Sequence, residues 1–207
     1  MKKMRLISLF ALASVISMPA FAANGIEGKI GLGSVKAASN KAGFDAGLAY
    51  ALRLEKFFAI VPEINFNWIS YDNSLGGAGA TGLTGATSST PSTNFYTIPI
   101  LLNGRLYIPM GADETPVFQP YITVGAGYGY SSFSTTGGGI NSSGSLSGFM
   151  YQFGVGGALN MGMIADGSPS ATSLIIEAGY RGGSLTYSGT GYDWGGYVVR
   201  AGVSFSM

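Results

Sequence analysis

The chain has 207 residues, of which only 10% are charged, and it contains no cysteine and no histidine. A soluble domain usually carries about a quarter charged residues, so this composition is poorly suited to cover a fold against water. Without histidine, Ser-His and Asp-His catalytic arrangements cannot form, and metal sites built on histidine or cysteine are excluded on the same ground.

The first 22 residues carry the three parts of a secretory signal peptide. Residues 1–5 are a basic leader, residues 6–16 are an apolar run, and Ala20-Phe21-Ala22 matches the small-x-small pattern of a cleavage site. The apolar run is shorter than the ~20 residues of a membrane-spanning helix, which disfavours an uncleaved anchor. We therefore expect a signal peptide at 1–22 and a single domain at 23–207.

Removal of the leader takes away three of the eleven basic side chains and leaves eight basic against ten acidic ones. A slightly negative chain gives no reason to expect nucleic-acid binding. The exported chain also holds itself together without disulfides, because it has no cysteine. We expect no cofactor and no enzymatic activity.

Eight segments of the chain alternate between apolar and polar or small side chains. Clusters of Gly, Ser, Thr, Asn or Pro separate them, which is typical of β-strands joined by turns. A period of two places successive side chains on opposite faces of a sheet. In chain order, the segments cover residues 26–33, 44–54, 60–68, 96–108, 121–130, 149–161, 174–181 and 197–207.

The last segment shows the pattern most clearly. Its apolar face consists of Tyr197, Val199, Ala201, Val203, Phe205 and Met207, and its other face of Arg200, Gly202, Ser204 and Ser206. An apolar outer face and a polar inner face are typical of a strand that lies between lipid and a water-filled interior, the reverse of a soluble protein. Because lipid offers no hydrogen bonds to the backbone, only a sheet without free edges spans it. The sequence therefore predicts an all-β, eight-stranded antiparallel transmembrane β-barrel.

The connections differ in length between the two rims of this barrel. The longer ones cover residues 34–43, 72–94, 131–148 and 183–192, and the shorter ones cover 54–57, 109–117 and 162–172. Bacterial outer-membrane barrels carry their longer loops outside. We predict that the Gly/Ser/Thr-rich loops 72–94 and 131–148 are exposed at the cell surface and contact host or envelope partners.

Two neighbouring segments resemble a known family. Residues 96–102 (YTIPILL) look like the proline-containing strand of the outer-membrane β-barrel domain family, and residues 119–127 (QPYITVGAG) resemble its next strand. The resemblance implies a small barrel of the bacterial outer membrane, of the OmpA, OmpX or opacity type, mostly without enzymatic activity. The family's usual terminal aromatic is replaced by Met207. We predict that Tyr197, Val203, Phe205 and Met207 form the signal that the barrel assembly machinery reads.

Most charged residues of the mature chain fall on the predicted lumen face. They are Glu27, Lys29, Asp45, Arg53, Glu63, Arg105, Glu177, Arg181 and Arg200. Strand neighbours suggest that Arg53 and Arg105 flank Glu63, and that Glu177 lies between Arg181 and Arg200. Buried charges must be paired or hydrated. They form either a salt-bridge plug or a polar path for small solutes, and we favour the plug because eight strands leave little room.

Aromatic residues gather near the predicted strand ends, among them Trp68, Tyr128, Tyr130 and Trp194. We predict that these four belong to the aromatic girdle at the membrane interfaces, while an adhesive or carbohydrate-binding cluster would use similar residues.

The sequence favours a non-enzymatic surface barrel in the lipid bilayer of the bacterial outer membrane. A narrow channel for small or amphipathic solutes is the main alternative. A soluble periplasmic barrel with an apolar ligand is a third, and it requires an apolar interior that the lumen charges contradict.

Overall fold

The computed structural model describes residues 24–38, 40–72, 91–110, 116–137, 140–165 and 167–207. The predicted signal peptide at 1–22 and most of the predicted loop 72–94 lie outside these residues. Among the described residues, no helix is long and apolar enough to cross a membrane.

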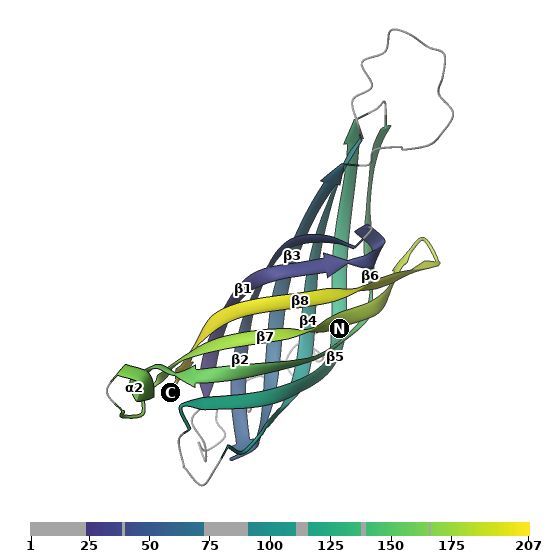
Figure 1. The fold of residues 1–207 in the computed structure, drawn as a ribbon. Coiled ribbons are helices and arrows are strands. Elements are labelled where there is room, and N and C mark those ends of the chain that lie inside the picture. The colour runs from purple at the N-terminus through teal and green to yellow at the C-terminus, as the bar shows by residue number, and fades with distance from the viewer. Residues whose placement is uncertain (1–23, 39, 73–90, 111–115, 138–139, 166) are drawn as a thin grey trace, which may run out of the picture.

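Eight strands form one closed antiparallel barrel in which each strand pairs with its neighbours in the chain and β8 pairs with β1 (Figure 1). The all-β, eight-stranded antiparallel prediction is confirmed. Two short helical turns lie in connections between strands, η1 (Lys36–Ala38) after the first strand and α2 (Met161–Ala165) after the sixth. The strands are β1 Gly25–Val35, β2 Lys41–Glu55, β3 Phe58–Asp72, β4 Ser92–Tyr107, β5 Phe118–Gly137, β6 Ile140–Asn160, β7 Thr172–Tyr187 and β8 Thr190–Ser206.

Alternation along the strands separates an apolar outer surface from the interior. Ile30 lies opposite Ala46 on β2 and opposite Ala201 on β8, so apolar residues continue around the outside of the ring. The outward side chains are exposed, with Ile176 at 67% and Tyr197 at 73%. Residues that directly face one another across an antiparallel pair share a face, which explains why one period-two pattern sorts the whole barrel.

The two rims of the barrel differ. The inner rim carries the described chain ends, Asn24 and Met207, and the connections 56–57, 108–117 and 161–171. The backbone N–H of Met207 donates to the Asn24 carbonyl, 2.7 Å away, beside the β1–β8 seam. The outer rim carries the other four connections, and β3, β4, β5 and β6 project there well beyond the rest of the barrel (Figure 1).

The predicted loop at 131–148 is wrong, because residues 131–137 and 140–148 belong to two paired strands. β5 continues to Gly137 and β6 begins at Ile140, with pairs from Ser131↔Leu146 to Gly137↔Ile140. The loop was predicted to begin and end where the outward-facing residues stop being apolar. Above a lipid-facing belt, outward residues no longer need to be apolar, so the pattern ends although the ladder continues.

The same reason shortens two other predicted loops. Strand pairing reaches Val35 on β1 and resumes at Lys41 on β2, which leaves only residues 36–40 of the predicted loop 34–43. Most of the predicted loop 183–192 lies in paired strands, which leaves a two-residue hairpin turn of Ser188 and Gly189, both with positive φ, 48° and 83°. Positive φ at both central residues is the geometry of a type I′ turn.

Candidate functional site

The interior of the barrel at mid-height is a network of charged side chains. Lys29 lies at its centre, and its Nζ is 3.1 Å from a carboxylate oxygen of each of Glu27, Glu63 and Glu177. All four side chains are buried. One ammonium therefore joins carboxylates that come from β1, β3 and β7, across the width of the lumen.

Two arginines close the network around these carboxylates. Arg105 binds Glu27 with both terminal nitrogens, at 2.5 and 2.8 Å, and reaches Glu177 at 3.3 Å. Arg200 donates to Glu63 at 2.6 Å and to Glu177 at 2.8 Å. Bidentate arginine pairing of this kind fixes geometry as well as charge.

A further pair extends the network towards the outer rim. Arg181 donates to Asp45 at 2.8 Å and to the Gln152 side-chain oxygen at 3.1 Å, and Arg200 lies 3.7 Å from Asp45. The network thus holds four cations and four carboxylates and is neutral. Neutrality matters because an unpaired charge at this depth would carry an uncompensated desolvation cost. Its members are Glu27, Lys29, Asp45, Glu63, Arg105, Glu177, Arg181 and Arg200.

The predicted neighbours within this set are partly wrong. Glu63 is flanked by Lys29 and Arg200, not by Arg53 and Arg105. Glu177 contacts Arg200 as predicted, but Arg181 pairs with Asp45 instead. The prediction used adjacency on a flattened sheet, whereas strand tilt and long side chains let residues from distant strands meet across the lumen.

Arg53, the ninth predicted lumen charge, lies apart from the network. It is half-buried near the inner rim, and its Nη2 donates to Gln119 at 2.8 Å. Its guanidinium carbon is 4.3 Å from the centre of the Tyr107 ring. No carboxylate lies within ion-pair distance of Arg53 in the part of the chain that the structure describes.

Above the charge network, towards the outer rim, the lumen is filled by apolar side chains, which we call the apolar cap. Tyr71, Phe95 and Phe133 pack against it. Its buried members come from six strands and η1, so it spans the lumen from wall to wall. They are Val35, Ala38, Ile69, Leu101, Leu146, Met150, Leu185 and Trp194.

The assignment of Trp194 to an outward girdle is wrong, because its side chain lies in this cap and is only 3% exposed. Trp194 is an odd number of residues from the outward Tyr197, so strict alternation along β8 places it inside. This signal was present in the sequence. The other side chains of the apolar cap were not predicted either, because the lumen was expected to be polar along its whole length.

Comparison with known proteins identifies the family. The model of the outer membrane protein beta-barrel domain matches residues 8–206. The chain belongs to the outer membrane protein beta-barrel domain family. The resemblance drawn from the two strand motifs is therefore confirmed, and this family member lies in the bacterial outer membrane, which excludes a soluble periplasmic barrel.

Solved structures with the same fold are distant in sequence. Neisserial surface protein A has 13% identity and a TM-score of 0.53, with 90% of this chain and 98% of that chain covered. Ail, the attachment invasion locus protein of Yersinia pestis, has 16% identity and a TM-score of 0.50, covering 89% and 100%. A major outer membrane protein from Thermus thermophilus has 12% identity and a TM-score of 0.50, covering 90% and 100%. No curated protein matches the chain.

The membrane explains the outer surface of this family member. Trp68, Tyr128 and Tyr130 point outward, and the Trp68 ring lies parallel to Tyr96 with ring centres 6.4 Å apart. Their part in an interfacial girdle stays a prediction. At the terminal strand, Tyr197, Phe205 and Met207 are exposed and Val203 is half-buried, and their reading by the assembly machinery also stays a prediction.

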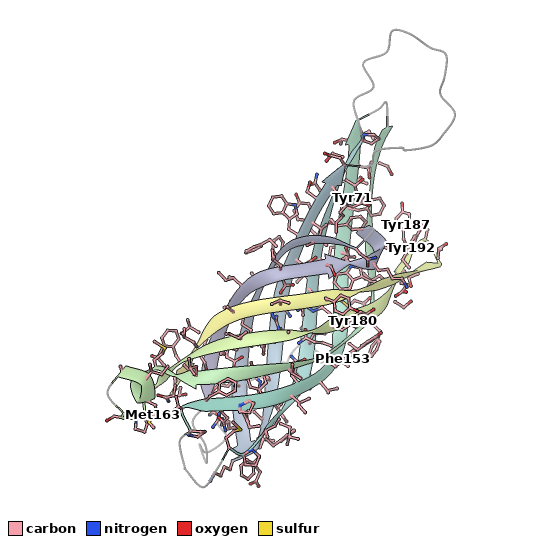
Figure 2. All side chains as sticks on the ribbon, in the orientation of Figure 1. Tyr71, Phe153, Met163, Tyr180, Tyr187 and Tyr192 are labelled. Carbon is pink, nitrogen blue, oxygen red and sulfur yellow. The ribbon has the colours of Figure 1, made fainter. Side chains whose placement is uncertain are left out.

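A second aromatic group lies on the outer surface of β6, β7 and β8. Figure 2 shows Phe153 and Tyr180 side by side, and their ring centres are 5.5 Å apart. Tyr180 also meets Tyr197 edge to face at 5.7 Å. A Cβ at Gly195 would clash with the Tyr180 hydroxyl, so glycine here lets the ring lie flat on the sheet.

Proposed function

We propose that this protein is a closed outer-membrane barrel that acts through the sheet it projects at the cell surface, and that it neither conducts solutes nor catalyses a reaction. The observation that carries the proposal is that two layers of side chains fill the lumen. A neutral charge network occupies mid-height, and the apolar cap lies above it.

A solute path would have to open both layers. Breaking a buried ion pair leaves an uncompensated charge and costs about 3–5 kcal/mol. Among its buried members, only the indole N–H of Trp194 is a strong side-chain hydrogen-bonding group, so the apolar cap offers a polar solute little to replace water. An eight-stranded lumen is also just wide enough for its side chains. These features support a plug over a path.

Planar-bilayer recording tests the closed lumen. We expect the refolded protein to be silent at voltages where a general porin in the same bilayer opens steadily. Glu63→Gln with Arg200→Met should also be silent, because the apolar cap remains in place when the charge network is weakened. Reproducible openings in the unmodified protein, changed by these substitutions, would establish transport and contradict the proposal.

The surface role rests on the projecting sheet, which we define as residues 69–72, 92–95, 131–137 and 140–146. The pairing of β6 with β7 begins only at Ser147↔Thr186, so residues 140–146 present one edge that no described strand covers. On the other side, β2 pairing with β3 ends at Phe44↔Trp68, which leaves residues 69–72 as a second edge. In this family the longer connections lie outside the cell.

Open strand edges are templates for main-chain pairing with an added strand. The face offers mostly serine, threonine and asparagine, with pairs such as Thr135↔Ser142 near the tip. Neisserial surface protein A and Ail, the attachment invasion locus protein of Yersinia pestis, share this fold. We therefore propose contact with a host or envelope protein through these edges. Insertion of the barrel by the assembly machinery, through its last strand, belongs to the same proposal.

Shortening the β5–β6 hairpin tests this surface. Residues 134–143 are replaced by Ser-Gly, so that Phe133↔Gly144 is closed by the same turn that closes β7 and β8. We expect binding of expressing cells to host-cell or matrix surfaces to fall at least tenfold. The short variant should still fold, as measured by the gel shift between unheated and boiled samples. Lys36→Gln, at the same rim but off the sheet, is the control. Unchanged binding in the folded short variant would contradict the proposal.

A further inference from the structure

The inner rim of the barrel contains a cavity of about 310 Å³, next to the end of the charge network. Its wall includes Arg53 and Lys56 from the β2 end, Tyr107 from β4 and Gln119 from β5. Glu27 and Arg105 form its floor. Because the charge network and the apolar cap lie above it, the cavity is reached from the inner rim. Its volume is at the small end of the range of ligand sites.

The charge in this cavity is unbalanced. Its lining includes three cations, Arg53, Lys56 and Arg105, and one carboxylate, Glu27. Glu27 is already engaged by Arg105 and Lys29 of the charge network. Neither Arg53 nor Lys56 has a carboxylate within ion-pair distance among the residues described. This contrasts with the deeper cations, each of which has at least one carboxylate partner.

Arg53 is positioned to bind a ligand. Its guanidinium lies over the Tyr107 ring at 4.3 Å, and one hydrogen bond to Gln119 holds the plane in place. A fixed guanidinium fork presents paired donors that match a carboxylate or phosphate. Asn160, another lining residue, is occupied as the cap of α2, where it accepts from Gly162 and Met163.

We propose that this cavity is a binding site for a small dicarboxylate from the periplasmic side. One carboxylate binds the Arg53 fork and the other pairs with Lys56, so that two ligand charges neutralise the two cations that lack a carboxylate partner. Hydroxyl groups of Ser204 and Ser206 line the same cavity and suit a polar ligand. This binding is separate from the proposed surface role, because the cavity and the projecting sheet lie at opposite rims.

Calorimetric titration of the full barrel refolded in micelles tests the site, with succinate as probe and succinamide as its neutral match. We expect saturable succinate binding that weakens with added salt, and none for succinamide. Arg53→Gln should weaken binding at least tenfold, Lys56→Gln less, and Arg53→Lys to an intermediate degree because charge remains without the fork. Lys36→Gln and Lys41→Gln at the outer rim should bind like the unmodified protein.

Three outcomes would overturn the proposal. The first is no saturable succinate binding, and the second is binding that Arg53→Gln leaves unchanged in a folded barrel. The third is inorganic phosphate binding more tightly than succinate, which would assign the site to phosphate groups. The connection 111–115 contains Asp113 and Glu114. Succinate binding that appears only after both are changed to amides would mean that the chain's own carboxylates fill the cavity, and this too would overturn it.

Discussion

Lys29→Met is expected to destabilise the folded barrel by about 3–5 kcal/mol, the cost of removing one partner from a buried ion pair. Methionine is similar in length but uncharged, so Glu27, Glu63 and Glu177 would lose the ammonium that each approaches to 3.1 Å. The loss is measured as the shift in urea unfolding of the protein in lipid vesicles, followed by tryptophan fluorescence.

A matched lysine at the outer rim provides the control. Lys36 pairs with Asp193 at 2.5 Å, but both side chains are more than half exposed. The hydrogen bond and charge of Asp193 raise the pKa of the Lys36 ammonium. Exposed pairs contribute little, so Lys36→Met should leave the urea midpoint close to that of the unmodified protein. Equal losses for the two lysine variants would show that the charge network does not hold the barrel together.

A rescue separates charge from packing in this experiment. Adding Glu63→Gln to Lys29→Met leaves three cations and three carboxylates, so the network is neutral again. We expect the double variant to recover part of the lost stability, because neighbouring charges in one network do not act additively. A double variant as unstable as the sum of the single ones would point to a packing defect.

Trp194→Ala is expected to cost about 3–5 kcal/mol, as for a large aromatic removed from a packed core. Trp194 lies inside the apolar cap, whereas Trp68 on the outer surface is 44% exposed and stacks on Tyr96. Trp68→Ala should therefore cost less. Urea unfolding of the two variants in the same vesicles, followed by electrophoretic mobility, measures the difference.

The chain's two tryptophans allow a direct check of the faces. Trp68→Phe leaves Trp194 as the sole fluorophore, and Trp194→Phe leaves Trp68. Brominated lipids should quench Trp68 strongly and Trp194 weakly, because only Trp68 lies on the outer surface of the barrel. Equal quenching would place Trp194 on the lipid side and contradict the position of the apolar cap inside the barrel.

Much of the barrel could be predicted because lipid enforces a simple rule. The alternation in residues 197–207 and the inward position of Arg200 follow from the cost of placing a charge against lipid. Where that cost ends, prediction fails, as it does at 131–148, where paired strands carry serine and glycine on both faces. Counting along β8 from Tyr197 would have placed Trp194 inside, so that error was avoidable.

The sequence alone determined the strand number, the two faces, the closed ring and the set of charges that point inward. Only the tertiary structure decided which charges meet: Lys29 among three glutamates, Arg181 with Asp45, and Arg53 apart beside Tyr107. The physical reason is that a face is a local property, set by the two-residue period of a strand and the solvent on each side. A pairing across the lumen depends on strand tilt, register and side-chain length together, and residues as far apart as Asp45 and Arg181 meet only once the ring has closed.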